Sequence, residues 1–212
     1  MPYVKDCDVT ARLEVAAGHY RLALNCPEIA AAATPGQFCM IQAQEGLYPF
    51  LRRPMSIERI FPDGISILFK VEGEGTKLLA KQHAGHKVNV QGPLGKGFPM
   101  EPSRRRHILV AGGIGVAPFP ALADAIIAGG GKAPEVILAA RTESLLICKK
   151  DFRQMGCSVR LATDDGSAGQ KGFAADVLKR MRLNKDDVVY TCGPMVMMRS
   201  IHEICVRKDI PC

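Results

Sequence analysis

The stretch "HILVAGGIGVAPFPALADAIIAGGG", residues 107–131, joins an apolar run, a glycine-rich turn and a segment with helical periodicity. The run after His107 has no polar interruption, which is typical of a strand buried on both faces of a sheet. Apolar residues then recur at helical spacing before three glycines, at Phe119, Leu122, Ile126 and Ile127. We therefore expect a strand, a tight turn and a helix, as in the first unit of a parallel α/β sheet.

The same alternation continues to the end of the chain. We expect further strands at 135–141, 158–165 and 187–193 and helices at 144–155, 173–181 and 195–208. Strands and helices alternating at this spacing predict a parallel sheet covered by helices on both faces.

In the sequence before this region, apolar residues recur at every second position instead of every 3.6 positions. Short alternating segments separated by Pro- or Gly-containing turns predict strands at 9–15, 20–26, 36–42, 64–71 and 86–92. Evenly spaced short strands favour an antiparallel β-barrel, with one helix near 75–82. The pattern changes near Pro102 to Arg106, so we expect two domains, residues 1–103 and 104–212.

The composition excludes several classes of protein. No apolar run approaches the ~20 residues of a membrane span, and residues 1–6 lack the core of a signal peptide, so we expect a cytoplasmic protein without a membrane span. The eight cysteines are scattered without a C-x-x-C pair, which indicates buried thiols in a reducing compartment. The net charge is +7, but only residues 104–106 form a basic cluster and aromatics are sparse. Phosphates of a small cofactor, or a solvated basic surface, fit these charges better than nucleic acid.

Three glycine-bearing turns follow predicted parallel strands, at the sheet edge where ligands of open α/β sheets bind. In the first, Gly112, Gly113 and Gly115 allow close approach of a phosphate to a helix N-terminus. The second, "TDDGSAGQKG", offers Asp164 and Asp165, either as turn formers or as acceptors from ribose or amide groups. The third brings Cys192, Gly193 and Pro194 to the same edge. Together they predict a nucleotide site.

The predicted barrel contains a second candidate phosphate site. Gly73, Gly75 and Thr76 lie at the start of the expected helix, where they form either a phosphate cradle or a simple capped turn with Thr76 as N-cap. "FLRRPMSIERI", residues 50–60, places Arg52 and Arg53 in a row inside apolar sequence. His83 and His86 lie in a loop around a glycine, and we expect no metal site there. With no evident acid–base set, the chemistry is expected to belong to cofactors.

The motifs "RRPMSI", "GEGT", "GPLGKGF", "GGIGVAP", "TDDGSAGQKG" and "YTCGPMVMM" occur in the order of the ferredoxin reductase-like superfamily. Over all 212 residues the chain most resembles the electron-transfer subunits of two-subunit bacterial dihydroorotate dehydrogenase. The resemblance implies an N-terminal FAD-binding barrel, a C-terminal NAD-binding α/β domain, and a flavoprotein catalytic subunit as partner in a hetero-oligomer. It also implies an oxidoreductase of pyrimidine biosynthesis.

The resemblance assigns residues to these cofactors. Arg53 would meet the FAD pyrophosphate and the Ser56 hydroxyl would lie near flavin N5, while Met55 stands where many relatives have an aromatic residue. The remaining expected FAD contacts are Pro54, Leu68, Phe69, Lys70, Gly75 and Thr76. The expected NAD(H) contacts are Gly112, Gly113, Gly115, Asp164, Cys192, Gly193 and Pro194. Ser56 and Cys192 are the candidate catalytic residues, and Arg52 is left without a partner, facing solvent.

The resemblance also implies a [2Fe–2S] cluster, held in the relatives by four cysteines in a C-terminal loop. That loop is absent from these 212 residues, and Cys205 and Cys212 alone are too few for the ligand set, so we assign no metal ligands.

Three alternatives stay open. Arg141, after the second parallel strand, could hold the 2′-phosphate of NADPH. The chain could instead be a reductase subunit serving ferredoxin, sulfide or sulfite chemistry, whose members share most of these motifs. It could also be a nucleotide-binding module without catalytic activity.

Overall fold

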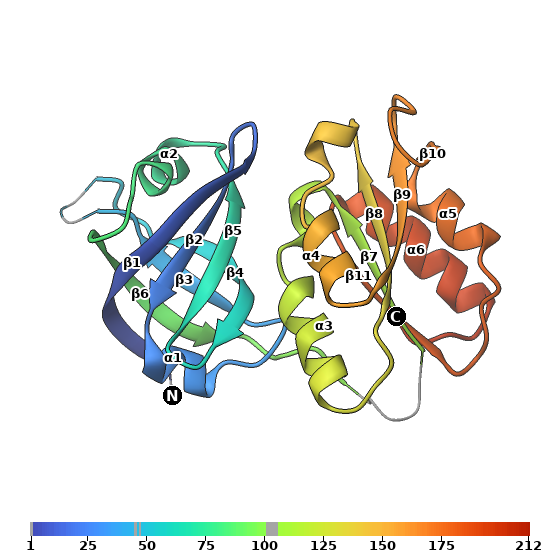
Figure 1. The fold of residues 1–212 in the computed structure, drawn as a ribbon, viewed down its shortest axis with the longest axis horizontal. Coiled ribbons are helices and arrows are strands. Elements are labelled where there is room, and N and C mark those ends of the chain that lie inside the picture. The colour runs from blue at the N-terminus through green and yellow to red at the C-terminus, as the bar shows by residue number, and fades with distance from the viewer. Residues whose placement is uncertain (1, 45, 47, 101–105) are drawn as a thin grey trace. The chain divides into compact units, whose positions relative to one another are not determined.

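The computed structural model describes residues 2–44, 46, 48–100 and 106–212. The chain divides into two compact units, Met1–Phe98 and Pro99–Cys212 (Figure 1). The predicted domain boundary between residues 103 and 104 lies outside the described residues. The prediction of an antiparallel barrel followed by a parallel α/β sheet is confirmed.

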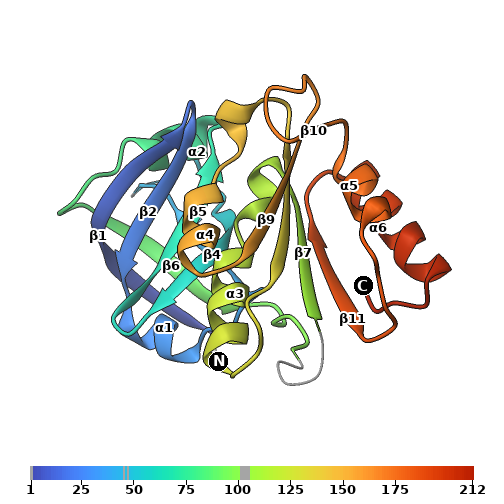
Figure 2. The ribbon, with the colours of Figure 1, turned by 45° about the vertical axis from the view of Figure 1, so that its right-hand side comes forward.

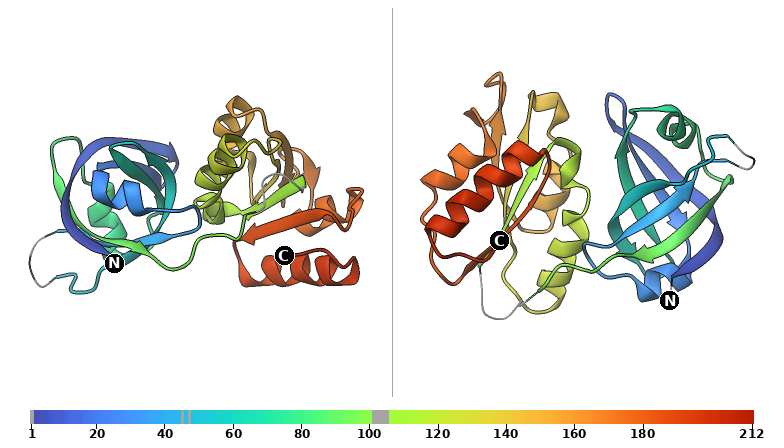
Figure 3. Two further views of the ribbon diagram at one scale, coloured as in Figure 1. Left: turned by 90° about the horizontal axis from the view of Figure 1, so that it is seen from below. Right: turned by 180° about the vertical axis from the view of Figure 1, so that it is seen from behind.

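The first unit is a closed antiparallel barrel with the strand order β1-β2-β5-β4-β3-β6, seen along its axis in the left view of Figure 3. Its elements are β1 (Tyr3–Ala16), β2 (His19–Asn25), α1 (Pro27–Ala32), β3 (Phe38–Gln42), β4 (Arg53–Phe61), β5 (Gly64–Lys70), α2 (Glu74–Ala80) and β6 (Lys87–Leu94). Alternate apolar side chains of the strands fill the interior, which is why the sequence has a period of two. Leu22, Ile41, Ile57, Ile67 and Val90 are all fully buried there.

A fully buried carboxylate joins three strands of the barrel. The Arg21 guanidinium donates to Glu58 through Nε at 2.8 Å and through Nη2 at 2.6 Å. The Ser66 hydroxyl donates a further hydrogen bond at 3.0 Å. Glu58 lies where β4 shifts register against β5, so this polar group is buried with its hydrogen bonds satisfied.

The second unit is a parallel five-stranded sheet with the order β10-β9-β8-β7-β11. Its elements are β7 (Arg106–Gly112), η1 (Gly113–Val116), α3 (Phe119–Ala128), β8 (Glu135–Ala140), η2 (Glu143–Leu145), α4 (Lys149–Gln154), β9 (Ser158–Thr163), β10 (Gln170–Lys171), α5 (Ala174–Arg180), β11 (Asp187–Cys192) and α6 (Met195–Arg207). In Figure 2, α3 and α4 lie on one face of the sheet and α5 and α6 on the other. Among the described helices, none is both long and apolar enough to cross a membrane.

Arg106, the one described residue of the basic cluster at 104–106, is tied into the amino end of this sheet. Its guanidinium donates to Asp187 at 2.9 and 2.6 Å and to Glu135 at 2.9 Å. It also donates to the Arg182 carbonyl at 2.7 Å, and the paired carboxylate of Asp187 raises the pKa of Arg106. Arg106 therefore fastens β7 to its two neighbouring strands and is not part of a free basic patch.

Three elements differ from the sequence-based expectation. The helix expected over 144–155 is wrong for residues 146–148, because Cys148 has a left-handed backbone (φ 60°) and α4 begins only at Lys149. α1 was not expected, since its run of alanines carries no apolar periodicity. β10 consists of two residues paired with β9, too short for a pattern in the sequence.

The cysteines fit the expectation of buried thiols. Cys192 is half-buried and Cys212 is exposed, and the others are buried: Cys7, Cys26, Cys39, Cys148, Cys157 and Cys205. Burial raises the pKa of Cys39 to about 12 and that of Cys157 to about 11, so both are neutral thiols near pH 7.

We expect Glu58→Ala to destabilise the barrel by about 3 kcal/mol, because it removes a fully buried carboxylate that accepts hydrogen bonds from the half-buried Arg21 guanidinium and the Ser66 hydroxyl. Urea unfolding followed by circular dichroism measures the change. Glu28→Ala is the matched control, since the Lys5–Glu28 pair is exposed and should leave the unfolding midpoint nearly unchanged. Equal effects of the two substitutions would contradict a special role for the buried carboxylate.

Candidate functional site

The glycine turn after β7 packs directly against the turn after β11. A Cβ on Gly115 would lie 2.4 Å from the Cys192 carbonyl oxygen and 2.6 Å from the Gly193 Cα. These are backbone atoms that cannot move aside, so position 115 has to be glycine. The predicted proximity of the first and third turns is thereby observed.

Gly112 and Gly193 make a second close approach between the same turns. A Cβ on Gly193 would lie 3.0 Å from the backbone N and Cα of Gly112, and Gly193 has φ +152°, which favours glycine. A Cβ on Gly112 would meet the Pro194 ring at 2.8 Å and the Met197 sulfur at 2.7 Å. The start of α6, with Pro194 as its N-cap, is therefore held beside the β7 turn.

Cys192 ends β11, where its side chain is half-buried and its residue is paired with Ala111 of β7. Burial raises the pKa of the Cys192 thiol, so the group is a neutral thiol at physiological pH. Such a thiol can contact a bound ring, but it is not an activated nucleophile.

The loop after β9 is tied to the turn after β8. The Asp165 carboxylate accepts hydrogen bonds from the Ser167 backbone N–H at 2.9 Å and the Ser167 hydroxyl at 2.6 Å. The Ser167 oxygen in turn accepts from the Glu143 backbone N–H at 2.8 Å. These bonds lower the pKa of Asp165, which acts as a turn-forming residue.

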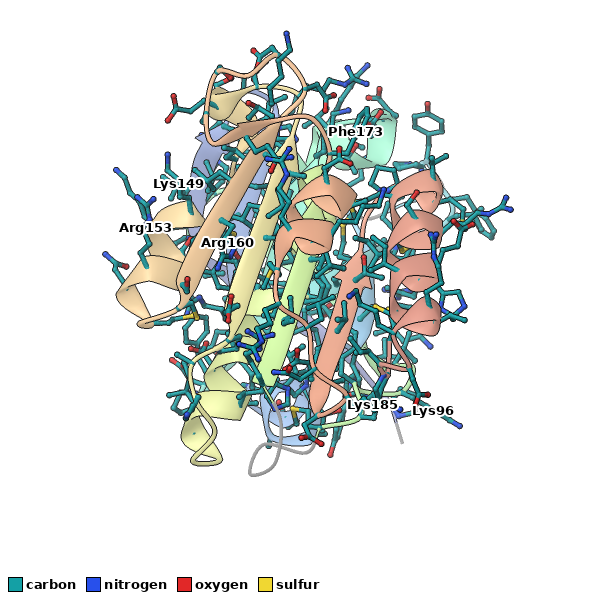
Figure 4. All side chains as sticks on the ribbon, turned by 90° about the vertical axis from the view of Figure 1, so that its right-hand side faces the viewer. Lys96, Lys149, Arg153, Arg160, Phe173 and Lys185 are labelled. Atoms are coloured by element: carbon teal, nitrogen blue, oxygen red, sulfur yellow. The ribbon has the colours of Figure 1, made fainter. Side chains whose placement is uncertain are left out.

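Asp164 differs from its neighbour, because its side chain is exposed and takes part in no hydrogen bond within the described part of the chain. Its backbone N–H donates to the Ala140 carbonyl at 3.2 Å, and that of Asp165 to the Arg141 carbonyl at 3.3 Å. The carboxylate of Asp164 and the exposed guanidinium of Arg141 thus lie on adjacent segments at the carboxyl edge. In Figure 4, Phe173 marks this end of the unit and Lys185 the opposite end.

In the barrel, Arg53 and Gly75 are in contact although 22 positions separate them in the sequence. A Cβ on Gly75 would lie 2.4 Å from the Arg53 Nε, so the guanidinium crosses the first turn of α2 where no side chain projects. Its Nη1 donates to the Leu51 carbonyl. This cradle brings a fork of N–H donors beside the first turn of a helix, a combination that suits phosphate oxygens.

Thr76 lies in the same turn, but its hydroxyl is already in use. Its Oγ1 accepts from the backbone N–H of Glu72 at 2.9 Å and of Gly73 at 3.1 Å, and it donates to the Gly73 carbonyl at 2.9 Å. The hydroxyl therefore holds the turn in shape, as the capped-turn interpretation required, although Gly73 and not Thr76 is the N-cap residue.

The other residues assigned to FAD lie on β4 and β5. Ser56 is half-buried and Pro54 is exposed, whereas the Met55 side chain is 7% exposed and packs in the barrel core. Leu68 and Phe69 are buried, and Phe69 lies beside Tyr20 with ring centroids 6.0 Å apart. The exposed Lys70 pairs with Glu72. Ser56 and Lys70 thus offer polar atoms, whereas Met55, Leu68 and Phe69 mainly supply packing.

The expectation that Arg52 faces solvent is wrong. Its guanidinium donates to the Asn89 carbonyl at 3.0 Å and to the Asn89 Oδ1 at 2.5 Å, which joins the start of β4 to β6. Ser167, Glu143 and Asn89 are the positioning residues that sequence reasoning missed. Only the "DDGS" turn carried a signal, because Asp followed by Ser two residues later is typical of an Asx turn.

Among the described residues, there is no group of three or more His, Cys, Asp or Glu side chains that could hold a metal ion. The residues that the structure describes therefore do not fit a [2Fe–2S] cluster. They do fit two nucleotides: an arginine beside a bare helix turn in the barrel, and glycine turns at the carboxyl edge of the α/β sheet.

Residues 109–203 match the family model described as the oxidoreductase NAD-binding domain. The whole chain is 39% identical to the "Dihydroorotate dehydrogenase B (NAD(+)), electron transfer subunit" of Desulforamulus reducens, and it covers 81% of that protein. The protein of the same name from Bacillus mycoides is 38% identical over 91% of this chain and 75% of its own length.

Solved structures agree with the fold. The NADH-dependent reduced ferredoxin–NADP oxidoreductase, described in work on flavin-based electron bifurcation, superposes with a TM-score of 0.82 at 27% identity, covering 96% of this chain and 73% of that chain. The ferredoxin reductase of carbazole 1,9a-dioxygenase has a TM-score of 0.85 at 23% identity, covering 99% of this chain and 67% of its own.

We expect Gly115→Ala to destabilise the α/β unit by about 3 kcal/mol or more and to weaken NADH binding, because the added carbon overlaps the Cys192–Gly193 backbone. Gly113→Ala is the matched control: it meets no atom within 4 Å but has φ +54°, so we expect a loss of about 1 kcal/mol. Thermal unfolding and titration with NADH measure both. A smaller effect of Gly115→Ala than of Gly113→Ala would contradict the packing described for the two turns.

Proposed function

This chain belongs to the family of dihydroorotate dehydrogenase B electron-transfer subunits, and we propose that it passes electrons between NAD(H) and a partner flavoprotein through FAD. The observation that carries the proposal is the 39% identity over the whole chain, which spans both the barrel and the NAD-binding unit. The partner is proposed to be the dihydroorotate dehydrogenase catalytic subunit, because the relatives are named as its electron-transfer subunits.

In the barrel, we assign the FAD pyrophosphate to Arg53 and the first turn of α2. The guanidinium supplies charge-assisted hydrogen bonds, and Gly75 lets it lie against the first turn of α2 because no side chain projects there. Ser56 offers its hydroxyl three residues further along β4, where a hydrogen bond to flavin N5 would orient the ring. Pro54, Met55, Leu68, Phe69, Lys70 and Thr76 shape the surroundings of these two residues.

In the α/β unit, we assign the nicotinamide nucleotide to the carboxyl edge of the sheet. Gly112 ends β7, Gly113 and Gly115 lie in η1, and Gly193 and Pro194 hold the start of α6 beside them. Asp164 offers an exposed acceptor, and Cys192 a neutral thiol. The cofactors supply the chemistry when bound, which is hydride exchange with nicotinamide followed by electron transfer from the flavin. The residues named here bind and orient.

The alternative of a reductase subunit serving ferredoxin has one specific observation in its favour. The ferredoxin–NADP oxidoreductase structure shares 27% identity with this chain. Its lower identity places it behind the dihydroorotate dehydrogenase assignment. Arg141 keeps open the use of NADPH, because its exposed guanidinium follows β8, the second strand of the nucleotide-binding unit.

The absorption spectrum of the purified protein is the first test. We expect a flavin spectrum that bleaches when NADH is added without oxygen, and reoxidation by orotate only when the catalytic subunit is present. A colourless protein that takes up no FAD would overturn the proposal. Equal or faster bleaching by NADPH would overturn the choice of NADH.

We expect Arg53→Ala to weaken FAD binding roughly 10- to 100-fold, because hydrogen bonds to a charged group each contribute about 1.5–3 kcal/mol. Gly75→Ala should weaken it in the same direction, since the new Cβ displaces the flexible Arg53 side chain. Titration of the flavin-free protein with FAD measures both. Lys87→Ala is the control, because it removes one exposed positive charge from the barrel outside this site. If Lys87→Ala weakened FAD binding as much as Arg53→Ala does, the effect would come from the overall positive charge of the barrel and not from a specific contact of Arg53.

A further inference from the structure

The connection between α2 and β6 is a tight turn that places two histidines side by side. The His86 backbone N–H donates to the His83 carbonyl at 3.0 Å, and Gly85 between them has φ +89°. A closing hydrogen bond and a positive φ at the third residue are typical of a type II turn, which favours glycine there. The first and fourth residues of such a turn are neighbours in space, and the two imidazole rings lie with their centroids 3.4 Å apart.

This turn is fastened to the barrel on both sides. Val9 of β1 accepts from the Gly85 backbone N–H at 3.0 Å and donates to the His86 carbonyl at 2.8 Å. Directly before the turn, the Gln82 side chain donates to the Ala43 carbonyl at 3.0 Å. The two rings are therefore presented by anchored backbone, which lowers the entropy cost of binding a ligand between them.

The hydrogen bonds of the rings determine which nitrogen carries the proton. The His83 Nδ1 lies 3.1 Å from the Ala84 carbonyl, which can only accept, so this Nδ1 donates. The His86 Nδ1 lies 2.9 Å from the Gln82 Oε1. The Gln82 amide nitrogen faces two backbone carbonyls, which fixes Oε1 as an acceptor, so the His86 Nδ1 donates as well. Each neutral ring then keeps a lone pair on Nε2, and neither Nε2 makes a hydrogen bond within the described part of the chain.

We propose that His83 and His86 bind one divalent cation that prefers nitrogen ligands, such as Ni²⁺ or Zn²⁺, through their Nε2 atoms, with water completing its coordination. Histidines that ligate metals almost always donate their other ring N–H to a carbonyl, carboxylate or water, and both rings here donate to a carbonyl oxygen. Two nitrogens bound to one ion at about 2.0–2.1 Å lie roughly 3 Å apart, which matches rings at this spacing. Among the described residues no third His, Cys, Asp or Glu joins the pair, so the site is open to water and exchangeable.

The sequence-based expectation of no metal at this loop rested on the glycine between the two histidines. In the structure the same glycine closes the turn that brings the rings together. The pair follows the C-terminal end of α2, whereas the proposed phosphate cradle lies at the first turn of that helix, so the metal site does not depend on the proposed function. Because Gln82 also donates to the Leu78 carbonyl at 3.4 Å, a bound ion would tie the end of α2 to β1.

Calorimetric titration with NiCl₂ of the protein purified without a polyhistidine tag tests the proposal. We expect one ion per chain, bound at least about tenfold more weakly by His83→Ala and by His86→Ala, since each variant keeps a single ligand. Gln82→Leu should weaken binding roughly tenfold by removing the acceptor that orients the His86 ring, and Gln82→Glu should keep it. His202→Ala is the matched control, because it removes a lone exposed histidine from α6. MgCl₂, whose ion prefers oxygen ligands, should not bind at this site.

Two readouts locate the ion without reference to electron transfer. In proton NMR, Ni²⁺ should broaden the ring signals of His83 and His86 before those of the other three of the five histidines. Saturating ZnCl₂ should raise the thermal unfolding midpoint of the wild type and leave that of His83→Ala unchanged, because an ion that binds only the folded chain stabilises it.

A wild-type chain that binds no Ni²⁺, or binds it as tightly after either alanine substitution in the turn, would overturn the proposed metal site. An equal loss of affinity in His202→Ala would assign the ion to surface histidines in general and would overturn it as well. A chain that binds Ni²⁺ at the turn but takes up no FAD would overturn the proposed function and leave the metal site supported.

Discussion

The contact on which the nucleotide-binding half depends is the backbone-to-backbone packing between the turns that end β7 and β11. Gly115 lies against the Cys192 carbonyl and Gly193 against the backbone of Gly112, at distances that leave no room for a Cβ. This packing brings the start of α6 beside η1 and gathers glycine backbone at one edge of the sheet. The same atoms that close the sheet edge therefore create its binding surface, and a substitution there changes fold and binding together.

The two-domain architecture is predictable from the sequence because the hydrophobic pattern of each domain is visible within short segments. A period of two over short segments indicates barrel strands, and alternating apolar runs and helical stripes indicate the parallel sheet. The glycine turns are also predictable, since a glycine at the end of a strand implies a positive φ or the close approach of another group to the backbone. In the barrel, the "RRPMSI" and "GEGT" motifs point to Arg53 and Gly75 separately, and the structure brings them into contact.

What the sequence does not reveal depends on residues far apart or on backbone conformation. Arg52 pairs with Asn89, 37 positions away, and neither residue signals the other. Met55 packs in the barrel core, a burial that a motif position next to a cofactor does not predict. Cys148 adopts a left-handed conformation, so the helix expected from residue 144 begins only at Lys149. The Arg52 and Met55 differences follow from which strands the barrel places side by side, whereas the Cys148 difference is one of backbone conformation.

The two candidate phosphate sites are built from different groups, and the difference fits the proposed roles. The barrel site uses a guanidinium beside a bare helix turn, so it offers charge-assisted hydrogen bonds about twice as strong as neutral ones. The sheet-edge site uses glycine backbone and a neutral thiol. In an electron-transfer cycle the flavin stays through many turnovers, whereas the nicotinamide nucleotide leaves after each one. The charged Arg53 site suits the flavin, which is retained. The glycine-lined sheet edge suits the nicotinamide nucleotide, because tighter binding there would slow its release.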